Sequence, residues 1–519
     1  MSALNRFYRN ARPHWPFCVL LVLFLFFTTI HIALIPNIWY DEGLNLNAAR
    51  TLAETGSYGL TSGASIRLGD PAIQTGMPML LPLAVLYRAF GPNLAVSRLF
   101  TVVCGMAALI ALYLLAWRMY GLFPAFLSAL LLLLLPGNST ATFVMMSRQV
   151  LGEVPAILCI TLGLHLVLNP QARWWSGILT GICFGIAITL KSQILLVLVA
   201  TMGLWTLYIL ARRRSEWRFW VATLAVMLLV YGADSMWRSS MAGAELATNL
   251  VTLREGIGIH ILPFRALLNL RQTGVWMALG LVAVTTSGTF FLPQVAPHTA
   301  VDRAPNRAKG LQGFLILFVS LWVVWFAFAS IGWQRYYFVG IVFTLILLGN
   351  EISRLWQHFL KRSATRLVYA GGCVLCAVSL SIMYIPQLAH TGEGNDFYAT
   401  VDYLRNQIPA DAKIVSMEWP VSYFSNQDYI YPPTSVINAL TAEIFLRRAF
   451  DPAMFDPLSD CPAYVLVGPF TERAIMQPAL QAAQAVPLSD HGPYQLYAIP
   501  PENLAQQADG TCKAITAAP

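Results

Sequence analysis

Long apolar runs separated by short polar stretches make up about the first three quarters of the chain. Eleven of these runs predict membrane-spanning helices, for which about 20 apolar residues is the usual length. They are residues 17–36, 94–117, 122–136, 151–168, 175–190, 192–210, 219–234, 274–292, 311–331, 336–348 and 367–385. The pattern therefore predicts an α-helical polytopic membrane protein.

One further apolar run, residues 77–90, has 14 residues and contains Pro78 and Pro82. It is too short to cross a bilayer, so we expect an interfacial or re-entrant helix within the first outer loop, residues 37–96. With eleven spans, the two chain termini lie on opposite sides of the membrane. "Outer" here means the side opposite the N-terminus.

The distribution of basic residues indicates which side is cytoplasmic. The six segments on the side of the N-terminus hold 16 of the 33 basic residues and 3 of the 25 acidic residues. These segments are residues 1–16, 118–121, 169–174, 211–218, 293–310 and 349–366. Arg6, Arg9 and Arg12 precede the first span as they would in a signal peptide, but no small-residue cleavage site follows. We therefore expect an uncleaved first helix and a cytoplasmic N-terminus.

The chain divides at the end of the last span. Residues 1–386 form the predicted transmembrane domain, and residues 387–519 form a polar outer segment. Helix patterns in this segment alternate with strand patterns, which predicts a small α/β periplasmic domain. The predicted helices are residues 396–407 and 471–485, and the predicted strands are residues 413–417, 463–467 and 495–499. Cys461 and Cys512 could form a disulfide there, which would imply an oxidising compartment.

Composition agrees with the membrane class and excludes several others. Hydrophobic residues make up 57% of the chain and charged residues 11%, with a mean hydropathy of +0.59. The net charge of +8 does not indicate a nucleic-acid partner, because no basic patch is interleaved with exposed aromatic residues. The chain has no phosphate-binding glycine loop, no zinc-binding histidine pair and no nucleophile elbow.

Charged residues gather at the predicted outer ends of the spans. Asp41 and Glu42 follow the first span, where they could act as a base, hold a cation or simply cap a helix. Arg98 begins the second span and could bind a ligand or anchor the helix at the interface. Arg148 and Glu153 lie five residues apart and could pair with each other or face a ligand.

Lys191 and Arg335, the latter followed by Tyr336, lie at two further outer turns. Lone basic residues at span ends are commonly anchors, but all of these groups share one depth and one face of the membrane. Cations at the membrane rim suit a phosphate ester whose tail stays in lipid. Neighbouring carboxylates suit removal of a proton from an incoming hydroxyl group.

These residues occur in an order that resembles the membrane glycosyltransferases with the C-type fold, which use polyprenyl-phosphate sugar donors. Relatives in that group include protein O-mannosyltransferases and lipid A aminoarabinose and galacturonic acid transferases. The matching pieces are Trp39-Tyr40-Asp41-Glu42, Gly76-Met77-Pro78, Phe90-Gly91, Ser97-Arg98-Leu99 and Ser147-Arg148 through Glu153-Val154-Pro155. The match extends from the first helix to about residue 210 and returns near Arg335.

The resemblance implies a role for each of these residues. Asp41 is similar to the family's catalytic base, and Glu42 to its supporting carboxylate. Donor-phosphate binding is implied for Arg98, Arg148, Lys191 and Arg335. A place in the cavity that receives the acceptor is implied for Glu153, Tyr40 and Tyr336.

The implied activity is transfer of a sugar from a polyprenyl-phosphate donor to a hydroxyl group of a glycan, lipid A or a protein. It would occur on the periplasmic face of a bacterial inner membrane, with inversion and without a cofactor or divalent metal. Two other classes stay open. One is a multi-span transporter or lipid flippase, which would favour charge at the bilayer midplane and internal repeats. The other is an envelope assembly scaffold that binds a partner through its C-terminal domain.

Overall fold

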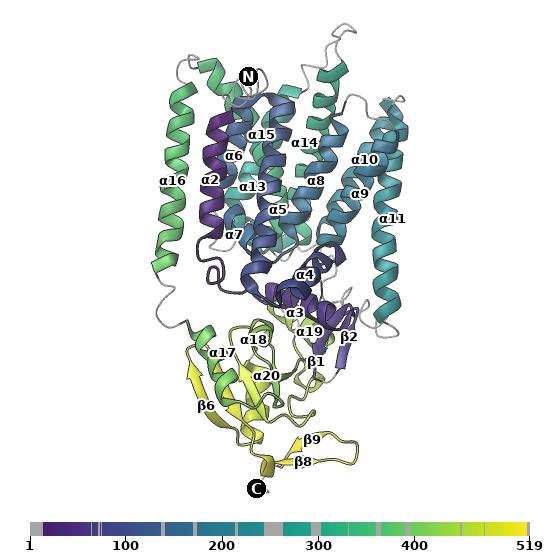
Figure 1. The fold of residues 1–519 in the computed structure, drawn as a ribbon. Coiled ribbons are helices and arrows are strands. Elements are labelled where there is room, and N and C mark those ends of the chain that lie inside the picture. Colours follow the sequence, from purple (N-terminus) through teal and green to yellow (C-terminus); the bar gives the residue numbers. More distant parts are fainter. Residues whose placement is uncertain are drawn as a thin grey trace.

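The protein is a bundle of long helices with a smaller mixed domain attached at one end (Figure 1). Helix α2 (Trp15–Thr29), the first helix of the described chain, starts at the end of the bundle that lies away from that domain. The structure, a computed structural model, describes residues 14–63, 65–70, 73, 75–135, 141–169, 174–212, 216–242, 263–291, 303–330, 332–359, 365–389, 395–446, 449–471 and 473–515. Arg6, Arg9 and Arg12 lie outside the described residues.

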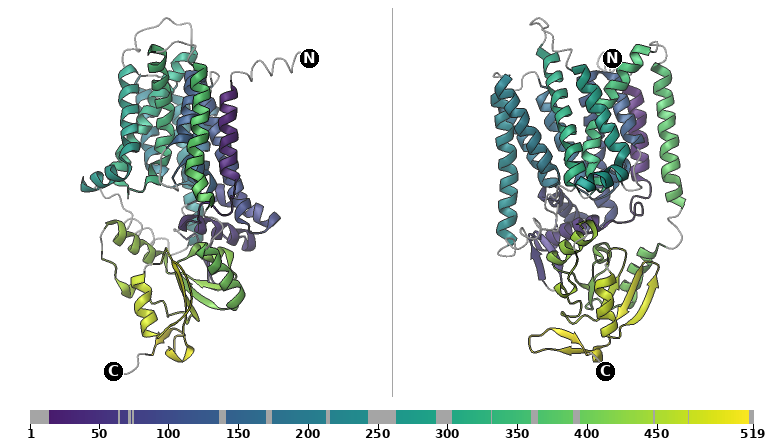
Figure 2. Two further views of the ribbon diagram at one scale, coloured as in Figure 1. Left: turned by 90° about the vertical axis from the view of Figure 1, so that its left-hand side faces the viewer. Right: turned by 180° about the vertical axis from the view of Figure 1, so that it is seen from behind.

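Each of the eleven predicted spans corresponds to one helix, so the predicted fold class is confirmed. The helices are α2 (Trp15–Thr29), α5 (Leu94–Tyr120), α6 (Leu122–Leu134), α8 (Glu153–Val167), α9 (Trp174–Leu190), α10 (Ile194–Arg212), α11 (Trp217–Ala242), α13 (Pro263–Phe291), α14 (Arg303–Ala329), α15 (Gln334–Phe359) and α16 (Thr365–Ala389). In the described part of the chain, six of these helices are long and apolar enough, by length and composition, to cross a membrane. They are α5, α10, α11, α14, α15 and α16. Their axes run side by side in all three views (Figures 1 and 2).

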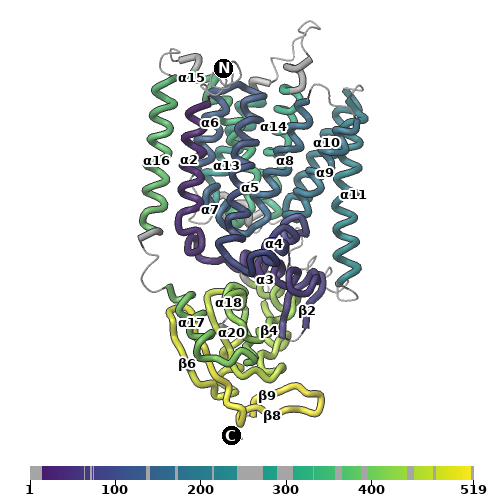
Figure 3. The backbone as a smooth tube through the Cα atoms, in the orientation of Figure 1, coloured from purple at the N-terminus to yellow at the C-terminus, as the bar shows by residue number. Residues whose placement is uncertain are grey.

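The segment after α2, expected as a loop, contains regular structure. Helix α3 (Tyr40–Thr55) begins with two acidic residues in its first turn, as helix N-termini favour. It is followed by the hairpin β1 (Gly59–Ser62) and β2 (Ser65–Leu68) and then by α4 (Met77–Phe90), whose bounds are those predicted from the sequence. Helices α3 and α4 lie between the bundle and the C-terminal domain (Figure 3).

The C-terminal domain is built on a five-stranded sheet with the strand order β4-β3-β5-β7-β6. Strand β3 is parallel to both β4 and β5, whereas β7 is antiparallel to β5 and β6. A second, two-stranded sheet pairs β8 with β9. The elements are α17 (Asp396–Gln407), β3 (Lys413–Ser416), α18 (Trp419–Phe424), β4 (Asp428–Ile430), α19 (Thr434–Leu446), β5 (Tyr464–Val467), α20 (Arg473–Ala482), β6 (Val486–His491), β7 (Tyr494–Ala498), β8 (Leu504–Gln506) and β9 (Cys512–Ala514).

The domain is docked directly on α3 and on the β1–β2 hairpin. The Asn47 side chain on α3 donates a hydrogen bond to the carbonyl of Trp419 at 2.9 Å. The backbone N–H of Gly63, beside the hairpin turn, donates to the carbonyl of Tyr429 at 2.7 Å. These bonds join the membrane domain to α18 and to edge strand β4, so the two domains share one interface next to α3.

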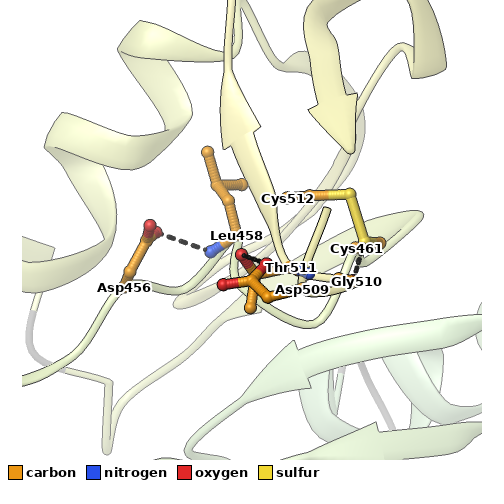
Figure 4. The surroundings of a disulfide bond; sticks show 7 residues. All are labelled: Asp456, Leu458, Cys461, Asp509, Gly510, Thr511 and Cys512. Carbon is orange, nitrogen blue, oxygen red and sulfur yellow. Dashed lines mark hydrogen bonds between the residues drawn. A yellow bond between two sulfur atoms is a disulfide. The ribbon is translucent and has the colours of Figure 1, made fainter. Parts of the chain in front are cut away.

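Cys461 and Cys512 form a disulfide within the C-terminal domain (Figure 4). The bond joins β9 to the segment before β5, and it closes a loop between residues 51 positions apart. Thr511, the residue before Cys512, donates through its backbone N–H to Asp509 at 3.0 Å. The disulfide therefore ties the β8–β9 hairpin to the segment that precedes β5.

Replacing both Cys461 and Cys512 by serine should destabilise the C-terminal domain. In the chain-entropy model, a disulfide that closes a loop of this length contributes about 4 kcal/mol to stability, which the variant would lose. Limited proteolysis of the full chain should then cut the variant within residues 395–515 at lower protease concentration than wild type. The control is Cys18→Ser, since Cys18 is an exposed free thiol on α2. Equal protease resistance of the two variants would contradict the prediction.

Candidate functional site

Two arginines hold the connection between α2 and α3. Arg148, at the end of the short helix α7 (Phe143–Arg148), donates to the carbonyl oxygens of Phe27 and Ile30, both at 2.7 Å. It also donates to the carbonyl of His31 at 3.0 Å. These carbonyls belong to the last turn of α2 and the residues after it, where a helix leaves its acceptors unsatisfied. Arg148 therefore caps α2.

Arg98 and Glu42 form a bidentate ion pair that is fully buried. The Arg98 Nε and Nη2 atoms lie 2.8 Å and 2.7 Å from the two carboxylate oxygens of Glu42, and both side chains are 0% exposed. Arg98 also donates to the carbonyls of Ile32 and Pro36, both at 2.9 Å. Glu42 in turn accepts a hydrogen bond from the backbone N–H of Val150 at 3.0 Å. The first turn of α3 is thus fixed to α5 and to the segment that precedes α8.

Asp41, next to Glu42, belongs to a different cluster with two cations and a second carboxylate. Its carboxylate accepts a hydrogen bond from Arg335 Nη2 at the start of α15. Arg335 Nε lies 3.4 Å from Glu153 Oε1, and Lys191 Nζ lies 3.1 Å from the same oxygen. The side chains of Lys191 and Glu153 are 3% and 1% exposed, whereas that of Asp41 is 25% exposed. The four formal charges sum to zero, and Asp41 is the member that solvent reaches best.

A close contact between two helix ends brings Glu153 to Lys191. Gly152 precedes α8, and a Cβ atom placed on it would lie 2.0 Å from the carbonyl oxygen of Leu190. Only a residue without a side chain fits there, so the N-terminus of α8 can approach the C-terminus of α9. Glu153 and Lys191, one residue beyond this contact on each chain segment, consequently form their ion pair.

Helix ends also set the electrostatics of the cluster. Glu153 lies in the first turn of α8 and Lys191 just beyond the end of α9, which are favourable positions for their charges. Arg335, in contrast, lies at the start of α15, where a cation opposes the helix dipole. The attraction of Asp41 and Glu153 offsets this unfavourable interaction of Arg335 with the helix dipole. Burial alone would raise the pKa of Asp41, but the attraction of Arg335 and Lys191 prevails and holds the pKa below its ordinary value.

The sequence predicted one ring of cations, and the structure divides it into separate networks. It brings Asp41, Glu153, Lys191 and Arg335 together, with Tyr336 beside them. Arg98 and Arg148 instead donate to Glu42 and to backbone carbonyls. Arg148 and Glu153 do not pair with each other, because each contacts a different helix end. Among the residues described above, no three His, Cys, Asp or Glu side chains are arranged to hold a metal ion.

Sequence reasoning missed several aromatic residues around Asp41. The Trp39 ring centroid lies 6.2 Å from that of Trp333 and 5.2 Å from that of Phe470. The Tyr40 hydroxyl accepts a hydrogen bond from the indole N–H of Trp419 at 3.2 Å. Phe470 and Trp419 belong to the C-terminal domain and are far from Asp41 in sequence. Hydropathy and spacing carry no signal for such contacts.

The protein is a helical bundle with an acidic helix start at its rim and a mixed domain docked on that helix. It has the C-type fold of glycosyltransferases that use polyprenyl-phosphate donors. The resemblance predicted from the sequence is thereby confirmed at the level of the fold.

Comparison with known proteins supplies one family match and three matches to solved structures. Residues 78–237 match the family described as dolichyl-phosphate-mannose-protein mannosyltransferase. ArnT from Cupriavidus metallidurans bound to undecaprenyl phosphate superposes with a TM-score of 0.62 at 14% identity, covering 94% of this chain and 98% of that chain. The Archaeoglobus fulgidus oligosaccharyltransferase in the apo form superposes with a TM-score of 0.52 at 12% identity, covering 94% and 74% respectively.

An archaeal oligosaccharyltransferase, AglB from Archaeoglobus fulgidus in complex with an inhibitory peptide and a dolichol-phosphate, gives a TM-score of 0.50 at 11% identity. That match covers 98% of this chain and 75% of that chain. No curated protein matches the chain by sequence. At these low sequence identities, the matches show that the proteins share a fold.

Glu42→Ala should strongly destabilise the protein, because it leaves Arg98 as a buried and unpaired charge. The expected loss is about 3–5 kcal/mol, measured by thermal unfolding of the full chain in detergent. The matched control is Glu54→Ala on the same helix, where Glu54 pairs with Arg50 and is 51% exposed. That exposed pair should contribute no more than about 1 kcal/mol. Equal losses in the two variants would refute the structural role of the buried pair.

Proposed function

We propose that the protein is an integral-membrane glycosyltransferase that moves a sugar from a polyprenyl-phosphate donor to a hydroxyl group of an acceptor. The observation that carries this proposal is the cluster of Asp41, Glu153, Lys191 and Arg335 at the end of the bundle nearest the C-terminal domain. It offers a partly exposed carboxylate beside two cations. The undecaprenyl phosphate bound to ArnT and the dolichol-phosphate bound to AglB support a lipid-phosphate donor.

In the proposed reaction, Asp41 accepts the proton of the acceptor hydroxyl as its oxygen attacks the anomeric carbon. The bond from that carbon to the phosphate oxygen breaks at the same time, so a second negative charge develops on the leaving phosphate. Arg335 and Lys191 stabilise this charge. Attack on the face opposite the leaving group inverts the anomeric carbon. The two cations supply the positive charge that the step needs, so the proposed mechanism includes no divalent metal and no cofactor.

The phosphate would compete with Asp41 and Glu153 for the same cations. As it takes over hydrogen bonds from Arg335, Asp41 becomes free to accept one from the acceptor hydroxyl. Donor binding would thus prepare the base. Glu153 keeps Lys191 and Arg335 close together, which otherwise repel each other. Tyr336 and Tyr40 lie at the same rim and complete the acceptor side of the proposed site.

We assign Arg98 and Arg148 to positioning rather than to direct phosphate binding. Glu42 and three carbonyls of residues 27–31 already occupy most of their guanidinium donors inside the protein. Both arginines fix the chain between α2 and α3, and so they determine where Asp41 lies. Glu42 supports Asp41 through the same contacts.

For orientation, we propose a bacterial inner-membrane protein with a cytoplasmic N-terminus and a periplasmic site. The excess of basic residues in the predicted cytoplasmic segments supports this arrangement. The disulfide between Cys461 and Cys512 is a second support, because such bonds persist in oxidising compartments. The acceptor would then be an envelope component with a free hydroxyl group, such as a glycan, lipid A or a protein.

Asp41→Asn should nearly abolish transfer, because an amide cannot accept the proton. Cells that lack the protein should accumulate a lipid-linked sugar, which mass spectrometry of extracted lipids identifies. In cells that carry Asp41→Asn this lipid-linked sugar should still accumulate, because the rate of sugar transfer should fall about 10²- to 10⁴-fold. The control variant is Asp402→Asn, at an exposed position on α17, which should clear the pool like wild type. Clearance by Asp41→Asn at the wild-type rate would overturn the assignment of the base.

Arg335→Gln should shift the acidic limb of the pH–rate profile to higher pH. Asp41 must be ionised to act as a base, and Arg335 holds the pKa of Asp41 down. Without this cation the burial of Asp41 raises its pKa, so activity on the acidic side is lost at a higher pH than in wild type. The profile would be measured with lipid-linked donor isolated from the deletion cells. Arg88→Gln, on the outer helix α4, is the control and should leave the limb in place.

A further inference from the structure

Three aromatic rings form a row next to the ion pair of Asp41 and Arg335. Trp39 contacts both of the other rings edge-to-face, with its centroid 6.2 Å from that of Trp333 and 5.2 Å from that of Phe470. The rings come from the residue before α3, the turn before α15 and the loop after β5. We call them the aromatic row.

The aromatic row is tied to the reacting groups by sequence and by contact. Trp39 lies two residues before Asp41, and Trp333 lies two residues before Arg335. The Arg335 guanidinium carbon is 5.7 Å from the centroid of the Trp333 ring. Two of the three rings therefore flank the two members of the ion pair.

The row differs from the aromatic core of the domain interface. In that core, Trp419 and Tyr431 stack with centroids 3.4 Å apart, and they are only 4% and 2% exposed. Trp39, by contrast, is 36% exposed, and Trp333 and Phe470 are half-buried. Large rings left partly open beside charged groups suit a ligand with an apolar face and a hydrophilic edge. A sugar ring has that shape, since its C–H bonds form a face and its hydroxyls an edge.

Glu418 determines the position of Phe470. Its Oε1 atom accepts hydrogen bonds from the backbone N–H of Phe470 at 2.9 Å and from the hydroxyl of Thr471 at 2.8 Å. A Cβ atom on Gly468 would lie 2.5 Å from Glu418 Cδ, so the loop needs glycine there to pack against the carboxyl group. The next residue, Trp419, donates to the hydroxyl of Tyr40. One buried side chain thus holds the Phe470 loop beside the contact between α18 and α3.

We propose that the aromatic row is a carbohydrate subsite on which a sugar ring stacks, and that Glu418 is the positioning residue for its Phe470 wall. This inference rests on the proposed glycosyl transfer and adds that the C-terminal domain contributes a substrate contact. The ring bound there belongs either to the donor or to the acceptor, and the chemistry of recognition is the same for both.

Saturation-transfer difference NMR on the full chain in detergent tests the subsite directly. The probes are methyl glycosides of neutral, amino and uronic acid sugars. In wild type, ring C–H protons of at least one glycoside should receive strong saturation. Phe470→Leu, which keeps an apolar side chain but no ring, should weaken binding about two- to tenfold. Phe470→Tyr should retain it, as should Phe455→Ala, which removes a partly buried ring packed on the domain's own core.

Trp333→Leu provides a second test on a different segment, in case Phe470→Leu alters the domain contact. Glu418→Ala should weaken saturation as Phe470→Leu does, whereas Glu418→Gln retains an oxygen acceptor and should keep the wild-type saturation. Unchanged saturation in both leucine variants, or no saturation of any glycoside by wild type, would overturn the subsite. Full saturation in Glu418→Ala would overturn the positioning role.

Competition distinguishes the source of the sugar. If the ring belongs to the donor, lipid-linked sugar isolated from the deletion cells should displace the glycoside, while undecaprenyl phosphate alone should not. If the ring belongs to the acceptor, neither lipid should displace it. Asp41→Asn should bind glycosides normally, because stacking does not use the base. Failure of the subsite would therefore leave the Asp41→Asn result standing, and failure of the proposed base would leave the NMR result standing.

Discussion

The start of α3 depends on the buried ion pair between Arg98 and Glu42. Removing two charges from water is so costly that neither residue can remain there without its partner. The pair therefore brings together α5, the connection after α2 and the segment before α8, all of which contact one of its two members. Neighbouring helix residues point about 100° apart. With Glu42 directed into the protein, Asp41 is directed toward Arg335 and the solvent.

The second cluster shows why such an arrangement suits chemistry. Arg335 lies at a helix N-terminus, where its charge is unfavourable, and it is retained by two carboxylates that a phosphate could replace. Helix α3 meanwhile contacts the C-terminal domain through Asn47 on another face. One short helix thus presents a structural carboxylate, the carboxylate that we propose as the base, and a docking surface. A shift of α3 would change all three together.

Much of the fold could be predicted from hydropathy, because a membrane helix must be apolar along its whole length. The run of residues 77–90 could likewise be separated from the spans by its length. Helix α3 was expected as a loop, because its partly polar surface packs against a protein domain rather than lipid. In the site, the residue types and their gathering at one end of the helical bundle could be predicted. Their division into a buried pair, a helix cap and an open cluster could not, because all these groups share the same local signature.

By itself, the sequence determined the helices of the bundle and the gathering of carboxylates and cations at one end of it, while their orientation across a membrane stays a prediction. Only the tertiary structure decided which charge meets which. Arg148 and Glu153 are five residues apart yet have different partners, whereas Asp41 and Arg335 meet across 294 residues. The reason is that helix packing, such as the contact of Gly152 with Leu190, sets the distances between charges. Local propensity sets only which residues begin and end each helix.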